Sequence, residues 1–425
     1  MIRMKRDEMK PEVKSIKKSL QYKNRFHKHG AKSTHVYPFV WNYLSESKGP
    51  FCKDIDGNTF LDLAQHAAST PLGYNHPEIE EALKEYKIID PIKMAGQDFY
   101  VKNKVPGPTE LQEKIVETTE KFNLDTVFLL NSGAEAVENA IKISYDRKGK
   151  KGVSFEKSFH GRTLGALTLT QRTGKYKKRY PKIPGVEKAP FCTCRDKYNG
   201  KCKCGAIEKA EKKIEETEEL SYIIIEPIQG EGGYRIPSKE FMKRIKDKTK
   251  DKNALFISDE IQAGLGRTGK FWAIEHYEVE PDVITSAKGL RVGATISNRD
   301  NFPEEKGRIS TTWGAGDILA SFIGYKTIEI IQKNNLVENA EERGKYLLKK
   351  LREMELEEVS NIRGKGLMAA IDFETKEKRN KVVQESFKNG LMLLGCGEKS
   401  IRFLPPLDIR EREIDIAVNT LKDII

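Results

Sequence analysis

The chain has 425 residues and a formal net charge of +12 at pH 7, and 38% of its residues are hydrophobic and 32% charged. This length predicts two or three domains, or one large domain with a smaller one, and a core that folds without disulfide or metal staples. No run approaches the roughly 18 consecutive apolar residues that span a bilayer. Residues 1–32 lack the apolar core of a signal peptide. We therefore expect a cytoplasmic protein with no membrane partner.

The positive charge raises the possibility of a nucleic-acid partner. Lysine and glutamate are intermixed, however, as in residues 208–213, and no nucleic-acid-binding signature accompanies them. Surfaces rich in both charges also occur in proteins from hot environments. We therefore expect a solvated charged surface and no nucleic-acid binding.

The first half of the chain changes its pattern at about residue 108. Residues 1–30 predict a basic helix or arm, and residues 51–62 alternate around Asp56-Gly57, which predicts a β-hairpin. After residue 108, strand, loop and helix patterns repeat, as in βαβ units with a mostly parallel sheet.

The second half ends in a different pattern. A break over residues 307–316 precedes a long helical stretch over residues 319–353. Residues 364–371 and 401–404 then predict strands. These segments predict a second, smaller α+β domain.

Four short apolar runs each end in polar or small residues. The runs are 126–130, 222–225, 254–257 and 282–285, followed by Asn131-Ser132-Gly133-Ala134, Glu226, Asp259 and Lys288 respectively. Ligands of open α/β sheets bind outside the carboxyl ends of the strands. The sequence thus predicts that a glycine turn, an acid and a lysine converge at one edge of a sheet.

Each of these features also has an ordinary structural interpretation. A glycine turn before a helix can bind phosphate, but Ser132 can also be a simple N-cap. Asp259 needs a cationic partner if buried, or it caps a helix. Lys288 is a nucleophile in a dry pocket, or an exposed lysine at a strand end. The combination carries more weight than any one of them.

A glycine-rich segment at residues 264–269 matches the pattern G-x-G-x-x-G. A dinucleotide-binding loop would open a helix directly after a strand, which this segment does not. A P-loop would need Ser or Thr where Phe271 stands. We therefore expect ordinary glycine-rich turns here.

The chain from about Tyr37 to its end resembles the class III (ω-) aminotransferases of the pyridoxal-phosphate fold type I family. The resemblance rests on motifs that begin at Asn131, Phe159, Glu226, Asp259, Lys288 and Arg402. It implies an α/β fold with a mostly parallel central sheet in a large domain and a smaller α+β domain made of both terminal segments. We expect an N-terminal segment at 1–60, a cofactor domain at 61–316 and a C-terminal domain at 317–425.

The resemblance implies pyridoxal 5'-phosphate as cofactor and assigns roles to individual residues. Ser132, Gly133 and Ala134 would hold its phosphate. Phe159 would stack on its ring, and His160 lies in the same motif. Gln262 would reach the phenolic oxygen. Asp259 would pair with the ring nitrogen, and Lys288 would form the Schiff base and move the proton. The cofactor-binding residues that the resemblance implies are Ser132, Gly133, Ala134, Phe159, His160, Asp259, Gln262, Lys288 and Thr312.

The resemblance also implies substrate and subunit contacts. Arg402 would bind the α-carboxylate of 2-oxoglutarate or glutamate, and Glu231 would neutralise Arg402 when the amine donor is bound. Arg162 would bind the distal carboxylate. Thr312 would bind the phosphate of the neighbouring subunit's cofactor, which implies a homodimer.

The reaction has two interpretations. Motifs near residues 68–73, 310–315 and 363–368 are more similar to lysine 6-aminotransferases than to acetylornithine aminotransferases. We therefore expect amino transfer from the terminal amine of a lysine- or ornithine-like diamino acid to 2-oxoglutarate. Racemisation or epimerisation of an amino acid on the same fold is the alternative.

Four of the six cysteines, Cys192, Cys194, Cys202 and Cys204, lie within thirteen residues. Four thiolates could enclose one Zn²⁺ ion. The Cys-x-Cys spacing is tighter than the usual Cys-x₂-Cys, and in a reducing compartment disulfides are disfavoured. We assign no metal ligand to the active site, and for the cluster both zinc binding and free thiols remain open.

Overall fold

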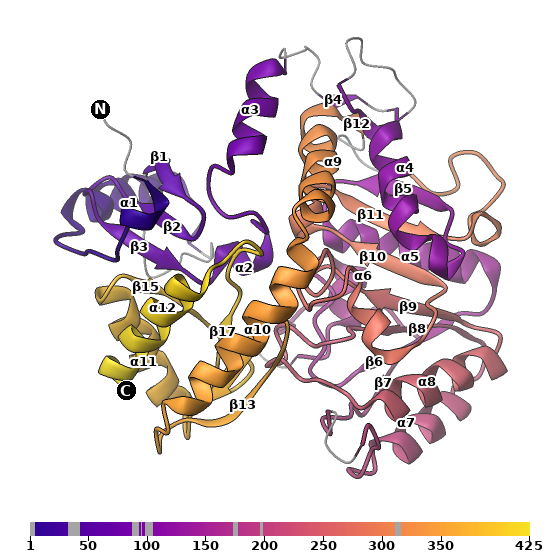
Figure 1. Cartoon of the computed structure of the whole chain (residues 1–425). Helices are drawn as coiled ribbons and strands as arrows, with labels where there is room; N and C mark the ends of the chain where they lie inside the picture. The colour runs from indigo at the N-terminus through magenta and orange to yellow at the C-terminus, as the bar shows by residue number, and fades with distance from the viewer. Residues whose placement is uncertain are drawn as a thin grey trace. The chain divides into compact units, whose positions relative to one another are not determined.

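The computed structural model describes residues 5–32, 43–86, 93–94, 96–97, 105–172, 177–195, 199–310 and 316–425. The chain divides into two compact units, one of residues 1–85 with 338–425 and one of residues 86–337 (Figure 1). The expected division into segments 1–60, 61–316 and 317–425 stays a prediction. Residues 59–62 pair with a C-terminal strand, and residues 318–333 pack on helices of the larger unit.

The larger unit contains a seven-stranded sheet. Its strands, in spatial order, are β5 (Thr126–Leu130), β11 (Gly293–Ser297), β10 (Val283–Ser286), β9 (Leu255–Asp259), β8 (Leu220–Ile225), β6 (Lys151–Phe155) and β7 (Val186–Ala189). All neighbouring pairs are parallel except those made by β11. The carboxyl ends of the six parallel strands therefore lie along one edge, as the sequence predicts.

Helices flank this sheet. They are α4 (Pro108–Thr119), α5 (Gly133–Arg147), α6 (Leu164–Leu169), α7 (Ala206–Glu215), α8 (Lys239–Asp251) and α9 (Ile318–Lys333). Short 3₁₀ turns lie at Glu120–Phe122, Ala273–Tyr277, Lys288–Leu290 and Arg299–Asn301, and a two-residue ladder joins β4 (Lys93–Met94) to β12 (Gly316–Asp317).

One core layer explains why α5 and the strand ends are fixed relative to each other. Aliphatic side chains of α5 and α6 pack on alternate residues of β8, β9 and β10, which all point to the same face. The buried set is Val137, Ala140, Ile141, Ile143, Ala166, Leu169, Tyr222, Ile224, Leu255, Ile257 and Val283. Each fully buried aliphatic side chain contributes about 1.5–3 kcal/mol.

The smaller unit joins both ends of the chain. Its strands are β1 (Tyr43–Lys48), β2 (Phe51–Lys53), β3 (Thr59–Asp62), β13 (Ser360–Lys365), β14 (Met368–Asp372), β15 (Leu391–Met392), β16 (Leu394–Cys396) and β17 (Ser400–Phe403). They form one sheet in the order β1-β2-β3-β15 and another in the order β13-β14-β17-β16. The pairing of β3 with β15 ties the N-terminal segment to the C-terminal one.

The helices of the smaller unit are α1 (Lys17–His29), α2 (Gln65–Ala68), α3 (Pro77–Glu85), α11 (Lys376–Lys388) and α12 (Glu411–Ile424), after a 3₁₀ turn at Arg6–Glu8. Helix α10 (Leu336–Glu353) begins just before the boundary between the units. In the described part of the chain, no helix has both the length and the apolar character that crossing a membrane requires.

Most predicted elements lie close to these bounds, and two differ in kind. Residues 364–371, expected as one strand, contain the end of β13, a turn at residues 366–367 and most of β14. The hairpin is formed by β2 and β3, and the glycine-rich segment at 264–269 is a series of turns. The helical stretch expected over 319–353 is two helices, α9 and α10. They are separated at Asn334 and Asn335, and Asn335 adopts a left-handed φ of 50° that a continuous helix cannot contain.

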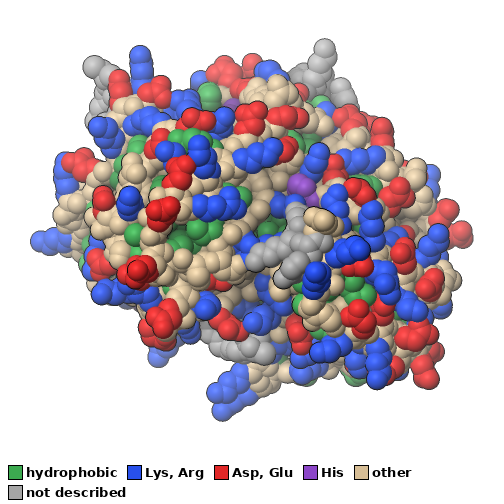
Figure 2. Space-filling model, turned by 60° about the horizontal axis from the view of Figure 1, so that its bottom comes forward, with side chains coloured by type: hydrophobic (Ala, Val, Ile, Leu, Met, Phe, Trp, Pro, Cys, Tyr) green, Lys and Arg blue, Asp and Glu red, His purple; other side chains and the backbone are tan. Residues whose placement is uncertain are grey.

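Charged side chains of both signs lie on the face of the molecule shown in Figure 2, where Lys and Arg are interspersed with Asp and Glu. On this face the distribution matches the expectation of a solvated charged surface.

Candidate active site

A pocket of about 610 Å³ lies in the larger unit, at the carboxyl ends of its parallel strands. Ten residues that the sequence singled out line it, and they are Ser132, Gly133, Ala134, Phe159, His160, Arg162, Glu231, Asp259, Gln262 and Lys288. Arg402 lies in β17 of the smaller unit, where it is 5% exposed. Thr312 lies outside the described residues.

The N-terminus of helix α5 forms one wall of the pocket. Ser132 is the N-cap, and its Oγ accepts a hydrogen bond from the Glu135 main-chain nitrogen at 3.3 Å. The Glu135 carboxylate in turn accepts from the Asn131 main-chain nitrogen at 3.1 Å. The structure therefore confirms the ordinary capping role of Ser132. The same turn presents the positive end of a 15-residue helix to the pocket.

Gly133 sits where no side chain fits. A Cβ atom at this position would lie 2.8 Å from Ile261 Cδ1 and 3.3 Å from Ala287 Cβ. Ile261 follows β9 and Ala287 follows β10, so the glycine allows the α5 turn to approach both strand ends. Main-chain N–H groups at such a turn are a ready site for a phosphate group.

Asp259 and His160 form a buried pair at the end of β9. Their side chains are 3% and 0% exposed, and His160 Nδ1 lies 2.7 Å from Asp259 Oδ2. Because the carboxylate only accepts, Nδ1–H donates and the other ring nitrogen, Nε2, carries no proton in the neutral ring. The second oxygen, Asp259 Oδ1, accepts from the Ile261 main-chain nitrogen at 3.2 Å. Both carboxylate oxygens are therefore fixed in direction.

Lys288 follows β10 with an unusual backbone conformation. Its φ is 48°, in the left-handed region, and it opens the 3₁₀ turn Lys288–Leu290. Such a conformation in a non-glycine residue costs about 1–3 kcal/mol and is concentrated at functional sites. The strain indicates that surrounding structure fixes the lysine at the pocket.

Glu226 lines the same pocket, although its sequence motif indicates no role for it. It is fully buried after β8, and its two oxygens accept from the main-chain nitrogens of Phe159 at 2.8 Å and Gly230 at 2.9 Å. Burial raises the pKa of Glu226 to about 7, His160 opposes the rise, and Asp259 adds to it. Its position after an apolar run, as for Asp259, was the signal that could have identified it.

Glu231 pairs with a residue that the sequence did not suggest. Its Oε2 lies 2.6 Å from Nη1 of Arg172, and the two side chains are 20% and 25% exposed. The expected pairing of Glu231 with Arg402 would join the two units and stays a prediction.

The sequence pattern of one family covers nearly the whole chain. The aminotransferase class-III family matches residues 32–425. The chain belongs to the class III aminotransferases. This class III aminotransferase therefore has the fold type I architecture and the pyridoxal-phosphate dependence that its motifs predicted.

Individual relatives agree with the family. A protein from Pyrococcus furiosus with the provisional name LysW-aminoadipate semialdehyde/glutamate semialdehyde transaminase is 36% identical over 386 residues, 90% of this chain and 95% of the relative. The ornithine aminotransferase of Oceanobacillus iheyensis is 32% identical over 412 residues, 93% and 96% of the two chains. The lysine aminotransferase from M. tuberculosis, solved in its internal aldimine form, superposes with a TM-score of 0.82 at 26% identity and covers 95% of this chain and 98% of its own.

The pocket of the class III aminotransferase fits pyridoxal phosphate. Gln262 Oε1 and His160 Nε2 are buried and have no hydrogen-bond partner among the described residues, as expected of atoms that face a polar ligand. Gly133 has no side chain to cover the main-chain N–H groups of the α5 turn, so a phosphate group can reach them. The Asp259 carboxylate suits a protonated ring nitrogen. These residues have the donors, acceptors and charge that the cofactor requires.

Proposed function

We propose that this aminotransferase moves the terminal amino group of a diamino acid, lysine- or ornithine-like, to 2-oxoglutarate in two half-reactions. The observation that carries the proposal is the shared pocket of Lys288, Asp259 and the α5 N-terminus, with Arg162 and Glu231 at the same pocket. The names of the ornithine and lysine aminotransferases that resemble this chain support the choice of donor.

The chemistry at the pocket follows from the side chains. Bound pyridoxal phosphate supplies an electron sink for the carbon that bears the amino group. The main-chain nitrogens at Ser132–Ala134 would bind the phosphate, and Phe159 would cover the ring. The Asp259 carboxylate would pair with the protonated nitrogen of the cofactor ring.

Lys288 is proposed as the residue that moves the proton. Its Nζ would take the proton from the carbon that bears the amino group and return it later in the same half-reaction. A lysine amine can do so only while neutral, and an enclosed pocket lowers the cost of that state. Gln262 would orient the cofactor through its buried amide.

Substrate selection is proposed to depend on charge. Arg402 and Arg162 would bind the two carboxylates of 2-oxoglutarate, because a guanidinium fork matches a carboxylate. Glu231 would neutralise Arg402 while the amine donor is bound, since the reacting end of that donor carries no carboxylate.

We further propose a homodimer in the cytoplasm, with Thr312 at the neighbouring subunit's phosphate. Size-exclusion chromatography with light scattering measures the assembly. Replacement T312A should weaken cofactor binding without dissociating the dimer. A monomeric holoenzyme would overturn this part of the proposal.

The proposed function is tested by a panel of amine donors with 2-oxoglutarate, following glutamate formation. Lysine or ornithine should give the highest kcat/KM, and K288A should lower kcat by about 10³-fold or more while the chain stays folded. Full transamination by K288A would overturn the assignment. Inversion of a single L-amino acid without any 2-oxo acid would support racemisation in its place.

A further inference from the structure

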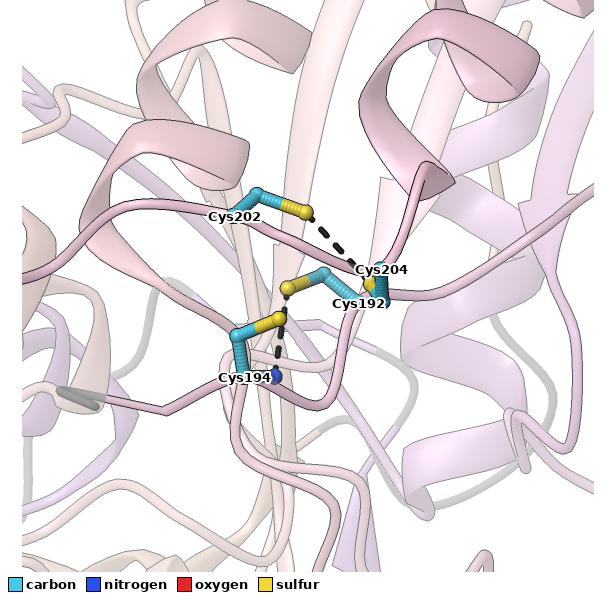
Figure 3. Close-up of side chains that lie close together, drawn as sticks. All are labelled: Cys192, Cys194, Cys202 and Cys204. Atoms are coloured by element: carbon cyan, nitrogen blue, oxygen red, sulfur yellow. Dashed lines mark hydrogen bonds between the residues drawn. The ribbon is translucent and has the colours of Figure 1, made fainter. Parts of the chain in front are cut away.

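The four clustered cysteines converge in space as well as in sequence. They lie in the loop between β7 and α7, and their Sγ atoms are all within 4.8 Å of one another (Figure 3). The side chains in Figure 3 come from two Cys-x-Cys pairs, Cys192 with Cys194 and Cys202 with Cys204. The residues that line the active-site pocket include none of them.

The spacing of the sulfur atoms suits a metal better than disulfides. Four ligands at the Zn–S distance of about 2.3 Å stand roughly 3.8 Å apart at the corners of a tetrahedron. Cys202 Sγ and Cys204 Sγ are 3.4 Å apart, well beyond the roughly 2.05 Å of a disulfide, and all four thiols are free. Small side-chain rotations are therefore enough to enclose one ion.

Main-chain hydrogen bonds already support thiolates at this cluster. The Cys194 main-chain nitrogen donates to Cys192 Sγ at 3.3 Å, and the Lys203 main-chain nitrogen donates to Cys194 Sγ at 3.3 Å. Donors that face the ligand sulfurs orient them and stabilise their negative charge. The tight Cys-x-Cys spacing, which counted against a metal in the sequence, makes the first of these contacts possible, and the second joins the two Cys-x-Cys pairs.

The charge around the cluster also suits four thiolates. One divalent ion with four thiolates carries two negative charges. The Arg235 guanidinium interacts electrostatically with Cys192 and Cys204, and its Nη2 donates to the Phe191 carbonyl at 3.2 Å. A fixed cation therefore lies beside the site.

The cluster adds contacts between its loop and the start of α8. Cys192 Sγ lies 3.6 Å from Oγ of Ser238, the N-cap of α8, and the Cys202 main-chain nitrogen donates to Glu240 Oε2 at 2.7 Å. The loop is thus held against the start of α8 and leads directly into α7. A metal ion here would fix this loop at the edge strand β7.

We propose that Cys192, Cys194, Cys202 and Cys204 bind one Zn²⁺ ion in a closed, structural four-thiolate site. Binding displaces the four thiol protons to solvent and involves no oxidation, because zinc has no redox chemistry. Thiolates are the ligands that select zinc over magnesium or calcium. All four positions are taken by protein ligands, so the ion has no open position for substrate.

The test is metal analysis of the purified holoenzyme by mass spectrometry, under reducing conditions and after dialysis against a mild chelator. We expect one zinc per chain. C204S, at the exposed member of the cluster, and C194S should each lower the zinc content at least tenfold and lower Tm by about 5 °C or more. C52A and C396A, two buried cysteines elsewhere, serve as matched controls and should keep their zinc.

A second measurement covers the case in which a variant fails to fold. The wild-type chain is treated with a mercurial thiol reagent while a zinc-sensitive dye reports released metal. Four thiols reacting per zinc released would support the site. The proposed zinc site would be overturned if the purified chain lacked stoichiometric zinc and the reduced chain took up neither Zn²⁺ nor Co²⁺. Iron in place of zinc would also overturn it. Because zinc content is independent of transamination, failure here leaves the proposed function standing.

Discussion

His160 Nδ1 donates a hydrogen bond of 2.7 Å to Asp259 Oδ2, and both side chains are buried. The bond fixes the Asp259 carboxylate from one side, while the Ile261 main-chain nitrogen fixes it from the other. The carboxylate that the sequence assigned to the cofactor nitrogen thus has a positioning partner. We propose that His160 acts on the reaction through Asp259.

We predict that H160L lowers kcat by about 10–100-fold, because Asp259 loses the donor that orients it. The variant should also shift the pH dependence of the cofactor's visible absorption band. If His160 had only a structural role, this pH dependence would not change. H160N keeps a donor near the Nδ1 position and should restore most of both properties. An unchanged pH profile in H160L would remove the positioning role.

The sheet could be predicted from sequence because its strands are continuous apolar runs. Thr126–Leu130 was predicted with the bounds that the structure has, and the runs before Glu226, Asp259 and Lys288 differ only at their ends. The runs that form β8, β9 and β10 are buried on both faces, so their composition identifies them without periodicity. The break between α9 and α10 was missed, although Asn334 and Asn335 are residues typical of a helix C-terminus, because apolar residues recur with helical spacing on both sides of them.

Part of the candidate site could also be predicted from sequence. Residues that follow strand ends were identified, because the parallel topology places them together. Arg172, the partner of Glu231, was missed because it stands in a loop with no motif. Glu226 was named in a motif without a role, since its burial and its two main-chain donors exist only in the folded chain.

The contact between Gly133 and Ile261 gives a second prediction. G133A places a methyl group 2.8 Å from Ile261 Cδ1, and crowding of this kind costs about 1–3 kcal/mol. If the α5 turn shifts to relieve it, the Kd for pyridoxal phosphate rises about 5- to 100-fold. The measurement is cofactor titration followed by absorbance.

A compensating variant sharpens this test. I261V removes the Cδ1 atom, so the double variant G133A/I261V should recover much of the affinity that G133A loses. I261V alone should bind the cofactor with little change. If the double variant is no better than G133A, the close approach of these two residues is not what positions the turn.

The buried Glu226 gives a third prediction, on pH and stability. Burial raises its pKa from 4.5 to about 7 in the folded chain, so the folded state holds the proton more tightly than the unfolded state. The stability that this provides is complete below about pH 4.5 and is lost as the pH rises through about 7. The full difference is about 3 kcal/mol.

E226Q removes this titration, so the free energy of unfolding should fall less between about pH 4.5 and 7 in the variant than in the wild type. Glu260 and Asp62 have pKa values raised by burial to about 7 and about 6, so they contribute in the same direction. The difference between wild type and E226Q isolates Glu226. Denaturant unfolding at several pH values provides the measurement, and parallel curves for the two proteins would contradict the prediction.

The ion pair between Arg172 and Glu231 gives the last prediction, on substrate preference. The two side chains are 25% and 20% exposed, so the pair contributes only about 0–1 kcal/mol to stability, and neither R172Q nor E231Q should change Tm much. E231Q removes a negative charge from the pocket, and we expect kcat/KM for lysine or ornithine to fall about tenfold relative to that for glutamate. R172Q keeps the Glu231 charge but removes the partner that orients it. We therefore expect kcat/KM for lysine or ornithine relative to glutamate to fall in R172Q as well, by a smaller factor.

The two ratios are measured in half-reactions with each donor. Equal losses for both kinds of donor would mean that Glu231 does not discriminate between them, because a group that selects by charge must affect the two donors unequally.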